Sequence, residues 1–383
     1  MGLLQGLQAA AGWVGWYILP FVFLVTVIVF FHELGHYLAG RWCGVKIEAF
    51  SLGFGPELCA WVDKRGTRWR LAAFPVGGYV KFLGDANAAS APDAEGVAAM
   101  APEERRLALA GQPLINRAAI VAAGPIANFV LAIVLFAALF LAFGQAEQTP
   151  RVGAVDPGSP AAQAGFAVGD LIKTVNGEPI ATFQDLQQQT LLSTGLPMTF
   201  VVERAGGEVR LTATPEIAVV DQGPLGRRRM GRLGLSSTRD PADVRIERCS
   251  PPVCVLWGAK ETGFLVQATV AYVGGLFAGR ETTDNLSGPL GVGQLAGEMA
   301  KVSLWQLLSL AGLFSVSVGL MNLLPVPLLD GGHLLYFAFE GLRGRPLSER
   351  VQQIGFRIGV AFVALLVIFT TSHDILRLVV GVN

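Results

Sequence analysis

Four long runs of uncharged, mostly apolar residues constrain this chain more than any other feature of its sequence. They cover residues 13–31, 118–143, 302–329 and 358–372. A helix of about 20 such residues crosses the apolar part of a bilayer. The last run is short, but Arg357 precedes it and its long side chain can extend to the membrane surface. We therefore expect four transmembrane helices.

The placement of Lys and Arg predicts how these helices are oriented. Ten of these residues lie between positions 41 and 117, and four more follow the third run, at 343, 345, 350 and 357. Basic loops stay in the cytoplasm, so both termini and the segment 144–301 are expected outside it. No charge precedes Glu33, so the start lacks the positive region of a secretory signal peptide and the first run is expected to remain in the membrane.

The first run ends in a metal-binding motif, His32-Glu33-Leu34-Gly35-His36. Positions i and i+4 share one face of a helix, so His32 and His36 can bind one ion while Glu33 acts on a water molecule beside it. Two imidazoles and a carboxylate around an open position favour zinc. The alternative is that these residues only cap the helix, but ionisable groups cost roughly 2.5–3.5 kcal/mol each at the centre of a span and are seldom idle.

Asp330 is the expected third ligand. It ends the uncharged run that begins at residue 302, and Pro325 and Pro327 before it break the helix and free backbone groups that need water or a cavity. Two alternatives remain open: Asp330 only caps a helix end, or His333 is the ligand. His373, beyond the fourth run, is expected at the surface.

The two halves of this motif must lie at the same depth, and this requirement limits the number of spans. With four spans, His36 and Asp330 both reach the cytoplasmic side. A fifth span at residues 262–279, an uncharged stretch with four glycines, would place Asp330 on the opposite side. We therefore expect residues 262–279 to form a helix on or near the outer membrane surface.

These motifs resemble the site-2 protease family of intramembrane zinc metalloproteases, and in particular its bacterial members that act in the sigma-E stress response. The resemblance runs along nearly the whole chain. Its further matching segments are Asn322-x-x-Pro325-x-x-x-Leu329-Asp330-Gly331-Gly332, Gly124-Pro125-x-x-Asn128, Ser287-Gly288-Pro289 and the tail 344–378. It implies that His32, His36 and Asp330 bind zinc, that Glu33 is catalytic and that Asn322 contacts the substrate backbone.

The resemblance also implies a membrane-dipping β-hairpin built from residues 51–56 and 74–81, in which Gly77, Gly78 and Tyr79 would contact the substrate. The residues themselves favour β-rich pieces between 45 and 82 with a turn near 64–66. Such a hairpin offers an edge to an unwound substrate strand. The alternative is an ordinary cytoplasmic hairpin.

The segment after the second run resembles one PDZ domain, where well-known members of the family carry two. Ser159 before Pro160 is typical of a helix N-cap, Gly165 of a helix end, and Asn176-Gly177 of a tight hairpin turn. A helix at 183–192 and strands at 198–204 and 208–214 are expected, and the arginine-rich stretch 226–234 is expected to be a solvated loop. PDZ domains bind peptides by strand addition, so this one either reads a trimmed substrate end or excludes uncut proteins by size.

Composition limits the other functions. The net charge is zero, so no basic field recruits nucleic acid. The four cysteines form neither a disulfide framework nor a zinc pattern; Cys249 and Cys254 are expected to be free thiols, or bridged if their segment lies in an oxidising compartment. A non-catalytic scaffold would not need Glu33, and a metal or proton transporter would be expected to carry ionisable residues in more than two runs.

The predicted fold class is a polytopic α-helical membrane protein with four transmembrane helices, a cytoplasmic-side membrane β-hairpin and one inserted periplasmic α+β PDZ domain. It is expected in the bacterial inner membrane with Zn²⁺ as cofactor. The expected partners are membrane lipid and a transmembrane peptide substrate, such as a pre-cleaved anti-sigma factor or a remnant signal peptide. The expected segments are a first helix (1–40), the hairpin region (41–117), a second helix (118–143), the PDZ domain (144–240), a membrane-proximal helical segment (241–301), a third helix (302–342) and a fourth helix with the C-terminus (343–383).

Overall fold

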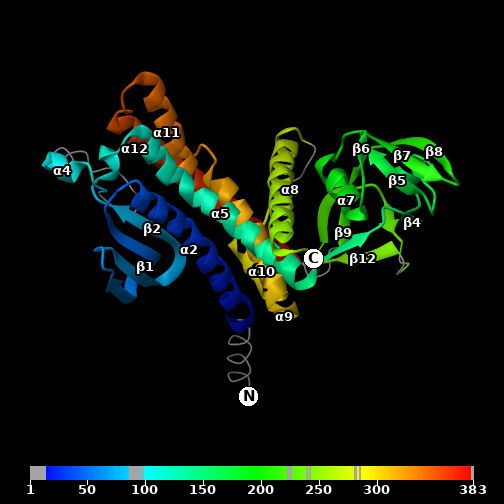
Figure 1. Ribbon diagram of the computed structural model, residues 1–383, viewed down its shortest axis with the longest axis horizontal. Helices are drawn as coiled ribbons and strands as arrows, with labels where there is room; N and C mark the ends of the chain where they lie inside the picture. The colour runs from blue at the N-terminus through cyan, green and yellow to red at the C-terminus, as the bar shows by residue number, and fades with distance from the viewer. Residues whose placement is uncertain are drawn as a thin grey trace, which may run out of the picture. The chain divides into compact units, whose positions relative to one another are not determined.

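The computed structural model describes residues 14–85, 96, 99–221, 227–238, 240, 243–279, 283 and 286–380. Trp13, where the first apolar run begins, lies outside these residues. The chain forms two compact units, drawn in Figure 1. Unit 1 consists of Met1–Leu135 and Gly288–Val379, and unit 2 of Phe136–Ser287 and Val380–Asn383.

Long helices make up most of unit 1. They are α2 (Leu19–Trp42), which follows a π-helical turn η1 (Val14–Ile18), the first part of α5 (Leu114–Phe143), α9 (Pro289–Val302), α10 (Leu304–Asn322), α11 (Asp330–Arg343) and α12 (Glu349–Val380). Among the described helices, four are long and apolar enough to cross a membrane: Gly15–Trp42, Leu114–Phe143, Leu304–Asn322 and Arg350–Leu376. Each of the four predicted spans falls on one of them.

The third apolar run is not one helix, and the break predicted from Pro325 and Pro327 is confirmed within the segment 302–342. Helix α10 ends at Asn322, an irregular segment carries Pro325 and Pro327, and α11 begins at Asp330. The prolines cause this break, because proline lacks the N–H that continues a helix. Helix α12 covers the break: a Cβ on Gly355 or Gly359 would run into Tyr336 and Pro327. His373 lies within α12 and is partly buried, so its expected position beyond the span is wrong.

The predicted hairpin consists of β1 (Ile47–Val62) and β2 (Arg68–Phe82), which pair antiparallel. Its turn contains Gly66, which has a left-handed backbone, and Asp63, whose carboxylate accepts bonds from the backbone N–H groups of Arg65 and Thr67. Both strands fold back on themselves, so residues 49–52 of β1 have partners at 68–71 and also at 78–81 of β2.

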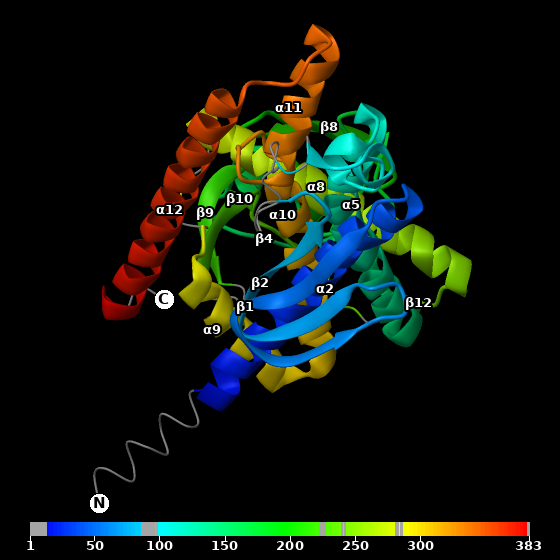
Figure 2. The same ribbon diagram turned by 90° about the vertical axis from the view of Figure 1, so that its left-hand side faces the viewer.

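The hairpin packs against the end of α2, as Figure 2 shows. The buried contact joins Ala39 of α2, Ile47 and Phe50 of β1, Phe82 of β2 and Ile120 of α5. Phe50 also stacks on Trp69, with ring centroids 4.3 Å apart. This apolar contact fixes β2 beside the helix that carries the metal-binding motif. A short helix α4 (Pro102–Arg105) and a 3₁₀ turn η2 (Leu109–Gly111) lead from the hairpin region to α5.

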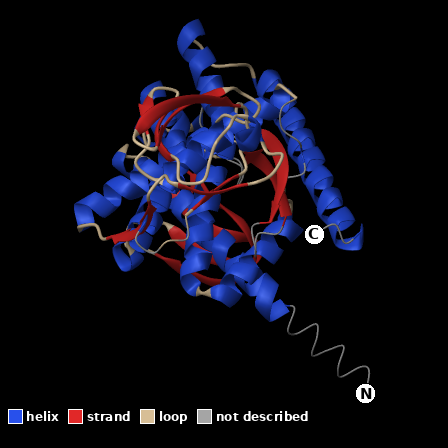
Figure 3. Cartoon of the chain, turned by 90° about the vertical axis from the view of Figure 1, so that its right-hand side faces the viewer, coloured by secondary structure: helices blue, strands red, loops and turns tan. Residues whose placement is uncertain are grey.

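Unit 2 is built mainly from β-strands, shown in red with those of the hairpin in Figure 3. Its largest sheet has the order β6-β5-β7-β8, with β5 (Leu171–Val175), β6 (Glu178–Pro179), β7 (Met198–Arg204) and β8 (Gly207–Ala213). Three further pairs join β3 (Gln145–Gln148) to β12 (Val244–Glu247), β4 (Val152–Val155) to β11 (Leu235–Ser237), and β9 (Glu216–Asp221) to β10 (Arg227–Arg232).

Three helices complete unit 2: α6 (Pro160–Gln163), α7 (Phe183–Leu192) and α8 (Pro251–Phe277). Several local predictions are confirmed here. The Ser159 side chain caps α6 by accepting a bond from the backbone N–H of Ala162. Asn176 and Gly177 both have positive φ, as a type I′ turn requires.

One expectation for unit 2 is wrong. The arginine-rich stretch 226–234 is not a loop, because Arg227–Arg232 forms β10 and pairs with β9. Of the two alternatives left open for Cys249 and Cys254, the structure shows the bridge, because the two residues form a disulfide. Proline at the first positions of α8 starts the helix directly after Ser250, so Cys254 lies one turn on and its Cα is 5.3 Å from that of Cys249, within disulfide range.

Helix α8 is longer than the predicted helix at 262–279, but it is not among the candidate spans within the described residues. The core of unit 2 contains an apolar cluster, with Phe200, Ile172, Leu186 and Met198 among its most deeply buried side chains.

Candidate metal centre

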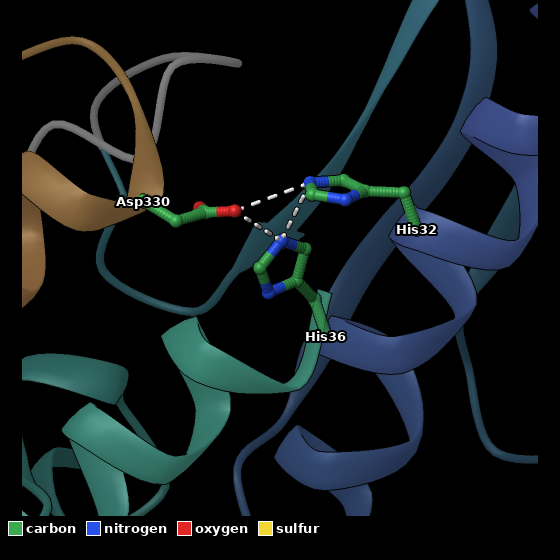
Figure 4. A group of neighbouring side chains, drawn as sticks. All are labelled: His32, His36 and Asp330. Carbon is green, nitrogen blue, oxygen red and sulfur yellow. Dashed lines mark hydrogen bonds and ion pairs between the residues drawn. The ribbon is translucent and has the colours of Figure 1, made fainter. Parts of the chain in front are cut away.

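Side chains from two distant helices of unit 1 meet at one point, as Figure 4 shows. His32 and His36 lie one turn apart on α2, and Asp330 is the first residue of α11. The His32 Nε2 atom lies 3.2 Å from Asp330 Oδ2, His36 Nε2 lies 3.5 Å from the same oxygen, and the two Nε2 atoms are 3.3 Å apart. The structure therefore brings together His32, His36 and Asp330, the three residues that the sequence predicts as ligands.

This triangle fits a zinc ion. Zinc binds nitrogen and oxygen ligands tetrahedrally at about 2.0–2.1 Å, which places neighbouring ligand atoms about 3.3 Å apart. The three observed separations lie close to this value. Asp330 Oδ2 is buried and has no hydrogen-bond donor apart from the two rings, so it has a lone pair to give to a cation. The donor set, two imidazoles and one carboxylate, is one that zinc favours and leaves a fourth position open.

The backbone of α5 orients His36. Its Nδ1 lies 2.9 Å from the carbonyl oxygen of Ile120. A carbonyl only accepts hydrogen bonds, so Nδ1 carries the proton and Nε2 keeps a free lone pair that points at Asp330. Helix α5 comes this close because it has Gly124 beside the rings: a Cβ there would collide with His36 and His32.

Two glycines allow the start of α11 to hold Asp330 close to the two histidines. Gly331 and Gly332 follow it in the first turn of α11, and both are buried. A Cβ on Gly331 would meet the carbonyl oxygens of Leu323 and Leu324, and one on Gly332 would meet that of Val326. The start of α11 can therefore lie directly on the proline-broken segment only because both side chains are absent.

Glu33 is buried next to the triangle and lines the same cavity as His32 and His36. Strand β2 comes close to it at Gly78, where a Cβ would lie 2.9 Å from Glu33 Cγ and 2.8 Å from the carbonyl oxygen of Ser51. Glycine at this position therefore leaves Glu33 the room it occupies. The arrangement holds a carboxylate beside the expected metal position without using it as a ligand.

The cavity has a volume of about 880 Å³ and lies within unit 1. Asn322, Gly78, Tyr79 and His333 line it, together with the three residues of the triangle and Glu33. Gly77 is not among the lining residues; its left-handed backbone lies against the Phe54 ring instead. His333 faces the cavity but is not part of the group that could hold a metal among the described residues.

Another part of the cavity lining is charged. Arg117 at the start of α5 forms two hydrogen bonds with Glu340 near the end of α11, at 3.1 and 2.5 Å, and both side chains are only 17% exposed. The Arg117 guanidinium also lies over the Phe337 ring, 5.1 Å from its centroid. The sequence does not predict this pair, because 223 positions separate its partners and no local pattern links them.

Comparison with known proteins gives a consistent result. The model of the family described as Peptidase family M50 matches residues 20–366. A protein of Agrobacterium fabrum named as a zinc metalloprotease is 45% identical over 373 residues, which are 97% of this chain and 99% of that protein. A similarly named protein of Rhizobium meliloti is 46% identical over 94% of this chain and 96% of its own. Metalloprotease MmpA of Caulobacter vibrioides is 40% identical over 93% and 94%.

Among solved structures, the PDZ domain of an SdrC-like protein from Listeria monocytogenes matches 23% of this chain and 84% of its own length. The identity is 17% and the TM-score 0.19, so this likeness carries no argument here.

Proposed function

The chain belongs to peptidase family M50 and is a zinc metalloprotease, and from this premise we propose that it hydrolyses a peptide bond in the membrane-spanning segment of single-span membrane proteins. We assign His32, His36 and Asp330 as the zinc ligands and Glu33 as the catalytic base. The observation that supports this assignment most is the meeting of two imidazoles and a distant carboxylate beside a buried glutamate, in a cavity next to apolar helices.

In this proposal the metal and the residues around it have separate roles in the reaction. Bound zinc would activate a water molecule and polarise the scissile carbonyl. Glu33 takes the proton from the attacking water and gives it to the leaving amine. Burial of Glu33 against Gly78 keeps its carboxylate beside the metal position rather than in bulk water.

A substrate helix must unwind before it is cut, because its carbonyls are hydrogen-bonded within the helix. Residues 78–82 of β2 have their β-sheet partners in β1, and Gly78, Tyr79 and Val80 of this stretch line the cavity. We propose that an unwound segment pairs with this edge by strand addition. Asn322, which also lines the cavity, would then hydrogen-bond the substrate backbone.

The placement in the cell follows from the charge pattern of the loops. We propose that the chain lies in the bacterial inner membrane with the metal centre near the cytoplasmic face and unit 2 in the periplasm. The Cys249–Cys254 bridge supports an oxidising compartment for unit 2. We further propose that residues 144–240 form a PDZ domain that reads or filters substrates, and that these are trimmed anti-sigma factors or remnant signal peptides cut in regulated intramembrane proteolysis.

The test uses the full-length protein in detergent with a model single-span peptide. We expect cleavage that a chelator stops and added Zn²⁺ restores, with product ends mapped by mass spectrometry to the membrane-spanning segment. Asp330→Ala should lose both zinc and cleavage. Glu298→Gln, which changes a carboxylate on α9 that does not line the cavity, should keep both. Cleavage that persists after complete removal of zinc would contradict the proposal.

A further inference from the structure

Asn128 on α5 is a fully buried polar residue that the proposed reaction does not use. It lies in the Gly124-Pro125-x-x-Asn128 motif, inside a helix long and apolar enough to span the membrane. A polar side chain in such a position is costly unless it has a partner. Its Nδ2 atom lies 3.2 Å from Nδ1 of His32, the proposed zinc ligand, while its Oδ1 is buried and has no hydrogen-bond donor.

Close packing between α2 and α5 brings Asn128 to this position. A Cβ on Gly35 of α2 would collide with the carbonyl oxygen of Ala123 on α5, and one on Gly124 of α5 would collide with both histidine rings. Small residues at these crossing points let the two helix backbones touch. On its other side, Asn128 is held through its backbone carbonyl, which accepts a 2.8 Å bond from the hydroxyl of Ser315 on α10. The side chain therefore reaches His32 from a fixed backbone.

The two histidines are thus held by the same helix, but in different ways. Ile120 O fixes His36 through a backbone carbonyl, which no substitution removes. Asn128 meets His32 through a side-chain amide, which offers either an acceptor or a donor. A histidine that binds metal through Nε2 carries its proton on Nδ1, and this proton needs an acceptor.

The two orientations of the amide have different consequences for His32. With Nδ2 toward Nδ1, the amide donates, and the His32 proton must lie on Nε2, where it blocks metal binding. With Oδ1 toward Nδ1, the amide accepts the Nδ1 proton, and Nε2 is free to bind. The second orientation is the same amide turned by 180°: it pairs Oδ1 with the Nδ1 proton and leaves Nδ2, instead of Oδ1, without a partner among the described contacts.

We propose that Asn128 is a positioning residue that fixes the metal-binding tautomer of His32 by accepting its Nδ1 proton through the side-chain amide oxygen. This inference rests on the proposed role of His32 as a zinc ligand. Helix α5 then supplies the outer hydrogen-bonding shell for both histidines of α2, from positions 120 and 128. Partners of this kind typically change metal affinity or activity by about 10–100-fold when they are lost.

The test measures the zinc dissociation constant of the full-length protein in detergent by competition with a chelator. Asn128→Leu has the same branched arrangement of side-chain heavy atoms but no acceptor, and we expect zinc to bind about 10–100-fold more weakly. Asn128→Asp keeps an acceptor oxygen and cannot donate, so its affinity should stay within a few-fold of wild type. Ser315→Ala is the matched control, because it removes the other hydrogen bond to Asn128 without changing the amide, and it should bind zinc normally.

The outcomes separate this inference from the proposed function. If Asn128→Leu binds zinc as wild type does while His32→Ala does not, the inference is wrong and the ligand assignment stands. If His32→Ala retains zinc, the ligand assignment fails and the inference with it. Equal losses in Asn128→Asp and Asn128→Leu would also overturn it, because they would mean that only the shape of asparagine matters. If Asn128→Leu does not fold, the contrast between Asn128→Asp and Ser315→Ala still decides: Asn128→Asp must bind zinc within a few-fold of the control.

Discussion

Both units of the chain bury apolar side chains, but they differ in what their helices expose and in where their buried polar groups lie. In unit 2, Phe200 and Ile172 are fully buried in an apolar cluster, as in a water-soluble domain, and Asp170 is buried with Arg204 as its partner. In unit 1 the helix α5 exposes Val130 and Val134 by more than half. The long helices of the same unit also bury polar side chains: Glu33, Asn128, Ser315 and Asp374.

This difference reflects two solvents. The hydrophobic effect folds a domain in water, but it does not draw apolar helices together in lipid, where van der Waals packing and hydrogen bonds take its place. Glycines that let backbones touch and buried polar side chains with defined partners therefore add to the apolar contacts that hold unit 1 together. The buried polar groups of unit 1 can also take part in a reaction, because Glu33 lies beside His32, His36 and Asp330 in this unit.

The largest effect is expected from Glu33→Gln, which tests whether a buried polar residue of unit 1 serves function rather than stability. A glutamine has nearly the same shape but cannot take a proton, so the cleavage rate should fall by about 10²–10⁴-fold. Zinc content and the hydrogen-exchange protection of α2 should remain those of wild type. Product formation from a single-span model peptide measures the cleavage rate, and metal analysis measures the zinc content.

The control for this variant is Glu48→Gln. Glu48 forms an ion pair with Lys81 on the hairpin, at 2.8 Å, and both side chains are about a third exposed. Its loss should leave cleavage within a few-fold of wild type. A Glu33→Gln variant that cleaves at the wild-type rate, or that loses its zinc, would contradict the assigned role.

A matched pair of substitutions tests the two solvents directly. Val130 on α5 is 53% exposed and Val168 in unit 2 is 69% exposed. Val130→Lys places a charge near the middle of a candidate span and should cost about 2.5–3.5 kcal/mol, whereas Val168→Lys should change stability by no more than about 0.5 kcal/mol. Local hydrogen exchange of α5 and β5 in the full-length protein measures both. Equal costs at the two sites would show that α5 does not face lipid.

The third prediction concerns a buried carboxylate of unit 2 and its paired cation. Asp170 is fully buried and accepts two hydrogen bonds from Arg204, both 2.7 Å long, and one from the backbone N–H of Ala167. Asp170→Asn should cost about 1.5–3 kcal/mol at neutral pH, because hydrogen bonds to a charged group are lost. Hydrogen exchange of β5 and β7 would register the change, and zinc binding should be unaffected.

The same pair gives unit 2 an acid sensitivity with a defined sign. Burial alone would raise the pKa of Asp170, but the hydrogen bonds from Arg204 and Ala167 hold it below its usual value. A depressed pKa in the folded state contributes stability that is present above the unfolded value of about 3.9 and is lost as the pH falls through the folded value. Wild-type protection should therefore fall in acid below pH ~4 more steeply than that of Asp170→Asn. The exposed pair Lys173–Glu203 serves as control, and Glu203→Gln should leave the protection of β5 and β7 nearly unchanged.

Much of the fold was predictable because its signals are local. Runs of apolar residues predicted the candidate spans, and caps and turns predicted α6, α7 and the turn at Asn176. What the sequence could not show depends on distant partners. The double pairing of residues 49–52 needs two separate stretches of β2, and β10 is recognisable only through its pairing with β9.

The site divides in the same way. The His32–His36 spacing and the charge of Asp330 at the end of an apolar run were enough to predict which side chains meet. Gly124 and Asn128 were noticed only as a family motif, because their value comes from the approach of α5 to α2. The role of Asn128 could have been suspected from the sequence, because an asparagine inside an apolar span is unusual.

The smallest effect is expected at Asp374, where unit 1 uses a buried carboxylate as unit 2 uses Asp170, but with backbone donors in place of a cation. Its two oxygens accept bonds from the N–H groups of Gly288 and Gly291, at 3.1 and 2.8 Å, and so join α12 to the start of α9. Asp374→Asn keeps one acceptor and loses the other, so it should cost about 1 kcal/mol and speed amide exchange in the first turn of α9.

Ser372→Ala on the same helix is the control, since the Ser372 hydroxyl bonds only within α12 in the described contacts, to the carbonyl oxygen of Ile368. It should leave the exchange of α9 unchanged. If Asp374→Asn also leaves it unchanged, the carboxylate does not hold α9, and the view that buried polar groups join the helices of unit 1 would be limited to the metal centre. If exchange rises in α9 alone, hydrogen bonds between a side chain and a backbone group also hold the outer helices of unit 1 together, as the bond between His36 and the carbonyl oxygen of Ile120 joins α2 to α5.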